Sequence, residues 1–151
     1  MKGIAKNGAS SEITWPYDIR KFTIKPSQIA LVEGKKHRTG FQYISVRRKL
    51  KTIKNALLQG FPIIVGYAVY SSFESDIVTT TGTAPMPNVA IETFLGGHAV
   101  LMVSYDDSTK RFGLMNSWGN QWGNQGFFTL PYDYILSPDL TWDMWAIRFF
   151  A

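Results

Sequence analysis

His98 is the residue of this sequence whose type and surroundings most suggest chemistry. It follows Gly96 and Gly97 and opens the apolar stretch Ala99–Val103. Two glycines let another backbone or a ligand approach closely, and an imidazole can exchange a proton near neutral pH. A structural histidine beside a strand is an equally good interpretation of this position. The other histidine, His37, lies in a polar run and is expected on the surface.

A second candidate is the run NSWGNQWGNQG, which begins at Asn116 and ends at Gly126. It contains two Trp-Gly pairs, at Trp118 and Trp122. One interpretation is a glycine-rich hairpin whose tryptophans fill the core. The functional interpretation is an asparagine side chain held under an indole, which keeps water from its hydrogen bond and so strengthens that bond.

Composition excludes several other kinds of site. The sequence has no cysteine, so disulfides, thiolate metal sites and a cysteine nucleophile within this chain are ruled out. Asp106 and Asp107 are adjacent in a predicted turn, where their side chains should point apart. No metal-spaced cluster and no glycine-rich phosphate loop followed by lysine occurs, so we expect neither a metal nor a cofactor.

The elements that must position these residues follow from hydrophobic spacing. Val46, Leu50, Ile53 and Leu57 form one apolar stripe and predict a main helix over about 45–58, with Ser45 as N-cap. Met1–Asn7 is expected to be helical up to Gly8. Thr23–Lys36 is expected to be irregular or an edge strand, and Ser71–Ala90 a loop. Strands are predicted over Phe61–Tyr70, Ala99–Tyr105, Arg111–Ser117, Gly126–Leu130 and Trp142–Phe150.

One helix followed by several strands with short turns favours an α+β fold built on an antiparallel β-barrel or curled sheet. The length of 151 residues suits a single domain over 1–151. No run reaches the roughly 20 apolar residues of a membrane-spanning helix.

Taken together, these residues resemble the papain-like cysteine peptidases over nearly the whole chain. The fold then implied is the β-barrel half of that family over 21–151, with 1–20 a remnant of, and link from, its helical half. The matching pieces are Gly96-Gly97-His98-Ala99-Val100, Tyr105-Asp106-Asp107, Asn116–Gly126, Glu12 with Trp15-Pro16-Tyr17, Tyr132-Asp133-Tyr134, and Asp143 with Trp145.

The resemblance implies roles for four side chains. In this family a histidine makes a cysteine thiolate and later protonates the leaving amine, while an asparagine oxygen fixes the imidazole. His98 and Asn116 match those two positions. Trp118 would cover their hydrogen bond, and Trp122 would pack beside the leaving-group side of the cleft.

Three glycines are implied on the substrate-binding side. Gly97 would line the specificity side with its backbone, with Gly96 beside it. The strand around Gly66 would lie near the pocket for the residue before the scissile bond. The implied substrate is a peptide or protein.

The departure from the family is the missing nucleophile. The resemblance places the cysteine and an oxyanion-hole glutamine in an N-terminal helical half, and Met1 falls where that half ends. Ser10 and Ser11 match the link and are not expected to replace the cysteine. Removing the nucleophile from related triads costs on the order of 10⁶ in rate. We therefore expect the histidine- and asparagine-bearing half of a peptidase, inactive alone.

Two other functions stay open. One is a non-catalytic binding or scaffold protein on the same fold. The other is a nucleic-acid-binding or acidic-partner-binding protein, because half of the 16 basic residues fall within one short segment. A solvated helix face is the simpler interpretation of that segment. Its residues are Lys35, Lys36, Arg38, Arg47, Arg48, Lys49, Lys51 and Lys54.

Partners and location can also be anticipated. An apolar wall that would face the helical half should be exposed, so we expect a cysteine-bearing helical half as partner, or self-association through that wall. The N-terminus lacks the apolar core of a signal peptide. Without cysteine as well, an intracellular or virion-associated setting is expected, and no membrane partner.

Overall fold

The computed structural model describes residues 2–37 and 41–149. By internal contacts the chain divides into two compact units, Met1–Tyr43 with Arg148–Ala151, and Ile44–Ile147. Among the described residues no helix is both long and apolar enough to cross a membrane. The predicted single-domain organisation over 1–151 stays a prediction.

The first unit contains α1 (Lys2–Asn7), η1 (Ile19–Lys21) and α2 (Gln28–Lys36). As predicted, α1 ends at Gly8, which has a φ of 71°. The irregular or edge-strand prediction for Thr23–Lys36 holds for residues 23–27 and is wrong for Gln28–Lys36, which form α2. The Ser27 side chain caps this helix by accepting from the Ala30 N–H. The buried residues of α2 are the small Ala30 and Gly34, so the sequence has no stripe of large apolar residues that would predict this helix.

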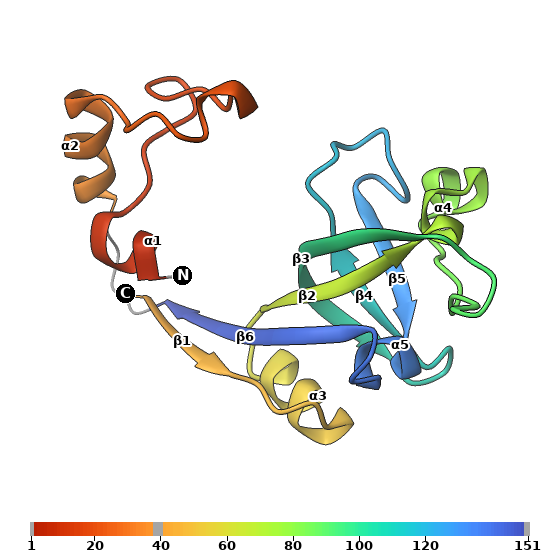
Figure 1. The fold of residues 1–151 in the computed structure, drawn as a ribbon. Coiled ribbons are helices and arrows are strands. Elements are labelled where there is room, and N and C mark those ends of the chain that lie inside the picture. The colour runs from red at the N-terminus through yellow and green to blue at the C-terminus, as the bar shows by residue number, and fades with distance from the viewer. Residues whose placement is uncertain (1, 38–40, 150–151) are drawn as a thin grey trace. The chain divides into compact units, whose positions relative to one another are not determined.

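The second unit contains most of a six-stranded sheet, together with short helices (Figure 1). The strand order is β1-β6-β2-β3-β4-β5. Antiparallel pairing joins β2 to β3 and β6, and β4 to β3 and β5. The strands are β1 (Phe41–Ser45), β2 (Ile63–Tyr70), β3 (Phe94–Asp106), β4 (Arg111–Met115), β5 (Phe127–Pro131) and β6 (Thr141–Phe149).

The α+β class and the antiparallel sheet are confirmed. The sheet is open, with β1 and β5 at its two edges, so the described strands do not close into a barrel. Four helical segments accompany it, and Figure 1 shows α3 near the start of β2 and α4 near its end. They are α3 (Leu50–Leu58), η2 (Ser71–Glu74), α4 (Asp76–Thr81) and α5 (Tyr132–Leu136).

The main helix is shorter than predicted. It begins at Leu50 rather than near Ser45, which is the last residue of β1. The buried Val46 donates its N–H to the Met144 carbonyl of β6, at 2.9 Å, and Lys49 occupies the N-cap position in an extended conformation. Val46, the first residue of the apolar stripe, therefore pairs with the sheet and does not belong to the helix. The predicted loop Ser71–Ala90 likewise contains η2 and α4.

Buried and partly exposed residues alternate over residues 63–67 of β2, whereas Ala68 and Val69 after them are both buried. On β2, Ile63, Val65 and Tyr67 are completely buried, while Ile64 and Gly66 between them are partly exposed. Residues directly opposite on antiparallel strands share a face, so the partners on β3 join the same core. That core continues through Phe73, Phe112, Phe128 and Ile135.

Two adjacent aspartates fix the β3–β4 turn, and they point apart as predicted. Asp106 accepts from Ser108 and Thr109 within the turn. Asp107 accepts from Lys54 of α3 at 2.5 Å and from the Tyr132 hydroxyl at 2.9 Å. The Lys54 ammonium, followed by Tyr132, holds the pKa of the Asp107 carboxyl below its usual range. The turn is thereby tied to α3 and α5.

The two glycines that end α3 and α4 offer a matched test of backbone packing. Gly60 (φ 76°) has open space where a Cβ would lie, whereas a Cβ on Gly82 (φ 69°) would lie 2.5 Å from the Phe127 carbonyl oxygen. We expect Gly60→Ala to cost about 1 kcal/mol of unfolding free energy. Gly82→Ala should cost about 3 kcal/mol, because overpacking adds to the same backbone penalty. Urea unfolding of both variants measures the difference, and equal losses would contradict it.

Candidate functional site

The strand pairing brings His98 and Asn116 together. His98 lies on β3 and Asn116 directly follows β4, and the β3–β4 register places Leu101 opposite Met115. The chain therefore leaves β4 beside the part of β3 that carries His98. The His98 ring nitrogen Nε2 lies 2.9 Å from the Asn116 side-chain oxygen Oδ1.

The direction of this hydrogen bond follows from the amide oxygen. Oδ1 of Asn116 also accepts the Ser117 backbone N–H at 2.8 Å. A carbonyl oxygen only accepts, so Nε2 must carry the proton and donate it to Asn116. In a neutral imidazole the other nitrogen, Nδ1, is then the acceptor. The hydrogen bond thus favours the neutral tautomer of His98 that leaves Nδ1 without a proton.

An indole covers this pair. The Trp118 ring stacks on the His98 ring, with centroids 4.9 Å apart and planes inclined by 24°. Trp118 is half exposed, so it covers one face of the imidazole with a ring whose own surface partly faces solvent. Excluding water lowers the local dielectric and strengthens the hydrogen bond beneath. The functional interpretation of the run placed the asparagine under an indole, and in the structure the indole stacks on the imidazole that this asparagine binds.

The loop from Asn116 to Gly126 is fixed at both ends and in the middle. Asn116 donates its backbone N–H to the Gly126 carbonyl at 2.9 Å, and Gly123 donates to the Thr79 carbonyl of α4 at 2.7 Å. A Cβ on Gly123, which has a φ of 62°, would lie 2.6 Å from the Phe127 carbonyl oxygen. The glycines of the run therefore allow the loop to pack against β5 and α4.

Trp122 packs against the Trp118 indole and against the core. Its ring meets Trp118 edge-on at 5.1 Å, and it contacts Phe73 at 5.7 Å and Phe128 at 5.4 Å. Both phenylalanines are buried. Trp122 therefore packs on the core, as one interpretation of the run predicts, while Trp118 stacks on His98.

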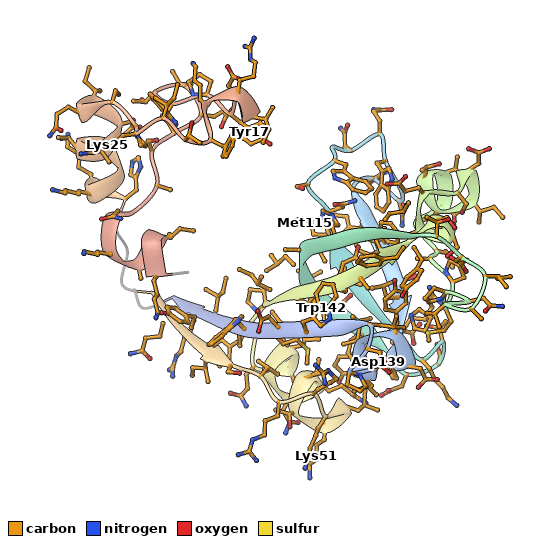
Figure 2. The ribbon with its side chains drawn as sticks, in the orientation of Figure 1. Tyr17, Lys25, Lys51, Met115, Asp139 and Trp142 are labelled. Carbon is orange, nitrogen blue, oxygen red and sulfur yellow. The ribbon has the colours of Figure 1, made fainter. Side chains whose placement is uncertain are left out.

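The three glycines of the predicted substrate side lie on neighbouring strands. Gly66 of β2 pairs with Ala99 of β3, and Gly97 pairs with Ala68. A Cβ at Gly66 or Gly96 would meet open space, whereas one at Gly97 would lie 3.0 Å from the Trp142 ring. Trp142 lies on β6, where Figure 2 labels it, and is half exposed.

The basic segment is divided between the two units. In the second unit, Arg48 donates to the Trp142 carbonyl and also contacts the Thr141 carbonyl, and Lys54 pairs with Asp107. Arg47, Lys49 and Lys51 are exposed. Arg38 lies outside the described residues. Part of the predicted cationic face is therefore engaged in structural contacts.

Three residues around the site were not anticipated from the sequence. Tyr67 and Phe73 contribute buried rings near His98, and Trp142 covers Gly97. Only the alternation of β2 could have pointed to Tyr67, and its partner depends on strand register. Within residues 2–37 and 41–149, no group of three or more His, Cys, Asp or Glu side chains could hold a metal ion.

Comparison with known proteins gives consistent matches. A family model described as papain family cysteine protease matches residues 1–135. An uncharacterized peptidase C1-like protein of Acanthamoeba polyphaga mimivirus is 38% identical over 156 aligned positions, which cover 98% of this chain and 50% of that protein. A cathepsin B-like protein of Giardia intestinalis is 29% identical, covering 85% of this chain and 43% of that protein.

A solved structure extends the match to three dimensions. The crystal structure of xylellain, a cysteine protease from Xylella fastidiosa, superposes with a TM-score of 0.85 at 32% identity, covering 99% of this chain and 60% of that one. This chain spans about half the length of the curated relatives that it matches.

The hydrogen bond between His98 and Asn116 can be tested by its contribution to stability. Asn116→Ala removes the acceptor of two hydrogen bonds, one of them to a partly buried imidazole. We expect a loss of about 1–3 kcal/mol of unfolding free energy in urea. Asn120→Ala is the matched control, because Asn120 is an exposed residue of the same loop. Equal effects of the two substitutions would contradict a special role for Asn116.

A carboxylate fixes the loop that leads into β3, and its protonation can be followed. Glu92 accepts from the Ser72 N–H at 3.0 Å and from the Asn88 N–H at 2.7 Å. The hydrogen bond from Ser72, followed by that from Asn88, lowers the pKa of the Glu92 carboxyl. A lowered folded-state pKa stabilises the loop above the ordinary value of about 4.3, and this stabilisation is lost as the pH falls through the lowered value.

We therefore expect hydrogen exchange at the Ser72 and Asn88 amides to lose protection in that acidic range, after correction for intrinsic rates. Glu92→Gln keeps a single acceptor oxygen, so it should reduce protection of at least one of these amides by roughly two- to tenfold at neutral pH. Unchanged protection in the variant would show that another interaction fixes the loop.

Proposed function

Because this chain belongs to the papain family of cysteine proteases, we propose that it supplies the histidine and asparagine of a Cys-His-Asn peptidase site. The chain itself contains no cysteine. The thiol comes from polypeptide outside this sequence, whether joined to it or separate. The reaction is hydrolysis of a peptide bond.

The observation that carries the proposal is the state of the His98 imidazole. Its Nε2 donates to Asn116, so Nδ1 is the atom that can take a proton from a neighbouring thiol. The resulting thiolate attacks the scissile carbonyl, and the imidazolium gives its proton to the leaving amine as the C–N bond breaks. Water then cleaves the acyl thioester, which releases the carboxylic acid and restores the thiol and the imidazole. Asn116 keeps the ring in one tautomer and orientation throughout.

Trp118 acts on this pair without touching the reacting atoms. By stacking on His98 it limits the access of water to the hydrogen bond with Asn116. Trp122 supports the indole on the side of the leaving group. These are positioning roles, and they fit side chains that pack on Phe73 and on one another.

The substrate side is formed by the glycines of β2 and β3. Open space at Gly66 and Gly96 leaves room for a peptide to approach the sheet, and Gly97 offers its backbone. The Trp142 ring forms an apolar wall there. We infer a peptide substrate that passes over these strands beside His98.

Several large apolar side chains are exposed in the second unit, and they suit a partner. We infer that the cysteine-bearing polypeptide covers part of this surface, and that the isolated chain self-associates through it. These residues, on β3, β4, β6 and the loop after β4, are Phe94, Leu95, Val103, Met115, Trp118 and Trp142.

A second candidate function is a non-catalytic binding protein on the same fold. The lack of cysteine in this sequence favours it. In that case the apolar surface would bind a partner permanently, and His98 would have no acid–base role. The two functions differ in whether a thiol reacts in a species that contains this sequence.

Covalent labelling tests the proposal. The native polypeptide is treated in its source with a thiol-reactive peptidyl epoxide and its intact mass is measured. We expect a labelled assembly that contains this sequence together with a cysteine. His98→Ala should slow labelling by on the order of 10²–10⁴, because the imidazole no longer takes the proton. The purified 151-residue chain should neither label nor cleave a dipeptidyl fluorogenic substrate.

Asn120→Ala serves as the control for the labelling rate, because it changes the same loop without reaching His98. An unlabelled species of 17.1 kDa that acquires no thiol partner would overturn the peptidase proposal in favour of the binding protein. Cleavage by the purified chain that is lost in His98→Ala would overturn the expectation that a cysteine must be supplied.

A further inference from the structure

Besides Asn116, His98 contacts two aromatic rings that belong to a closed set of four. The centroid distances are 5.9 Å from His98 to Tyr67, 5.7 Å from Tyr67 to Phe73, 6.0 Å from Phe73 to Trp118, and 4.9 Å from Trp118 back to His98. We call these residues the ring set. Each ring of the set therefore contacts two others.

We propose that Tyr67 is a positioning residue that holds the His98 imidazole in the orientation in which Nε2 meets Asn116. It acts through His98 and touches neither a thiol nor a substrate. Its importance for peptide hydrolysis rests on the proposed function. Its effect on the imidazole is a property of this chain alone.

The backbone explains why Tyr67 can do this. Tyr67 of β2 lies directly opposite His98 of β3, and opposite residues of antiparallel strands project to the same face. Cross-strand register thus places the two rings in contact, at an interplanar angle of 65°. Sheet hydrogen bonds fix both Cα positions, so the contact does not depend on a loop.

The surroundings of Tyr67 make it the immobile side of the ring set. Its side chain is completely buried, whereas 44% of Trp118 is exposed. Phe128 and Tyr134 also contact the Tyr67 ring, at 6.3 and 5.9 Å. A rotation of the imidazole would disturb the stack on Trp118 and the edge contact with Tyr67 at once. Two rings, one rigid and one half exposed, therefore oppose that rotation.

The Tyr67 hydroxyl is not the part that positions His98. It is buried and has no hydrogen-bond partner among the described residues. Burial raises the pKa of this hydroxyl well above its ordinary range, so it stays neutral. Positioning must then come from the ring, and phenylalanine should replace tyrosine here without loss.

The experiment is ¹⁵N NMR of the full chain labelled at histidine, which reports the tautomer of each imidazole from its two ring nitrogens. Tyr67→Leu should lower the ratio of Nε2–H to Nδ1–H tautomer at His98 by roughly two- to tenfold, the factor that corresponds to the loss of one ring contact. Tyr67→Phe should retain the wild-type ratio. The exposed His37 provides an internal reference.

Phe128→Leu is the matched control for damage to the core. Phe128 is 1% exposed and contacts Tyr67, Phe73 and Trp122, with no ring contact to His98 among the described residues. We expect it to destabilise the chain without moving the His98 tautomer ratio. If Tyr67→Leu does not fold, Tyr67→Met, whose unbranched and flexible side chain adapts better to the shape of the space, takes its place.

Two results would overturn the proposal. One is an unchanged His98 tautomer ratio in folded Tyr67→Leu or Tyr67→Met. The other is an equal change in Phe128→Leu, which would assign the effect to general core packing. Because the measurement uses a chain without cysteine, it can fail while thiol labelling succeeds, and the reverse also holds. The two proposals are thus tested separately.

Discussion

The hydrogen bond from His98 Nε2 to Asn116 Oδ1 is the constraint around which the second unit is organised. It joins β3 to the loop after β4, and it selects the tautomer that leaves Nδ1 as the base. A single hydrogen bond contributes only about 1 kcal/mol net in water. Its value here comes from geometry, because strand pairing and the stacked Trp118 ring hold two partly buried side chains within hydrogen-bond distance.

That geometry rests on two independent supports. The first is strand pairing, which sets His98 opposite Tyr67 and brings the end of β4 beside it. The second is aromatic packing, in which Trp118 and Trp122 stand on the buried Phe73. Glycines in the loop let its backbone approach β5 and α4 closely enough for this packing. Few charges take part, so the arrangement should depend little on salt.

The chain thus orients an imidazole and the amide that binds it, and it contains no cysteine. Its own strands and rings hold the imidazole and the amide, so this pair does not need a cysteine in order to form. A thiol brought to Nδ1 would meet a base whose tautomer is already selected. This preorganisation is what links the fold, the family relationship and the proposed function, and it reduces the reorganisation needed when the thiol arrives.

The sequence by itself predicted His98 and Asn116 as candidate residues and located most of the strands, because residue types, glycine pairs and two-residue alternation are local signals. It also predicted that the Asp106 and Asp107 side chains point apart, and the two carboxylates bind different partners. The sequence did not predict α2, whose buried face consists of small residues. It also placed the start of the main helix too early, because Val46 hydrogen-bonds to β6 instead of beginning the helix. Only the tertiary structure decided that Tyr67, Phe73 and Trp142 surround the glycines and His98. Those contacts depend on strand register and on chain segments far apart in sequence, which no local pattern records.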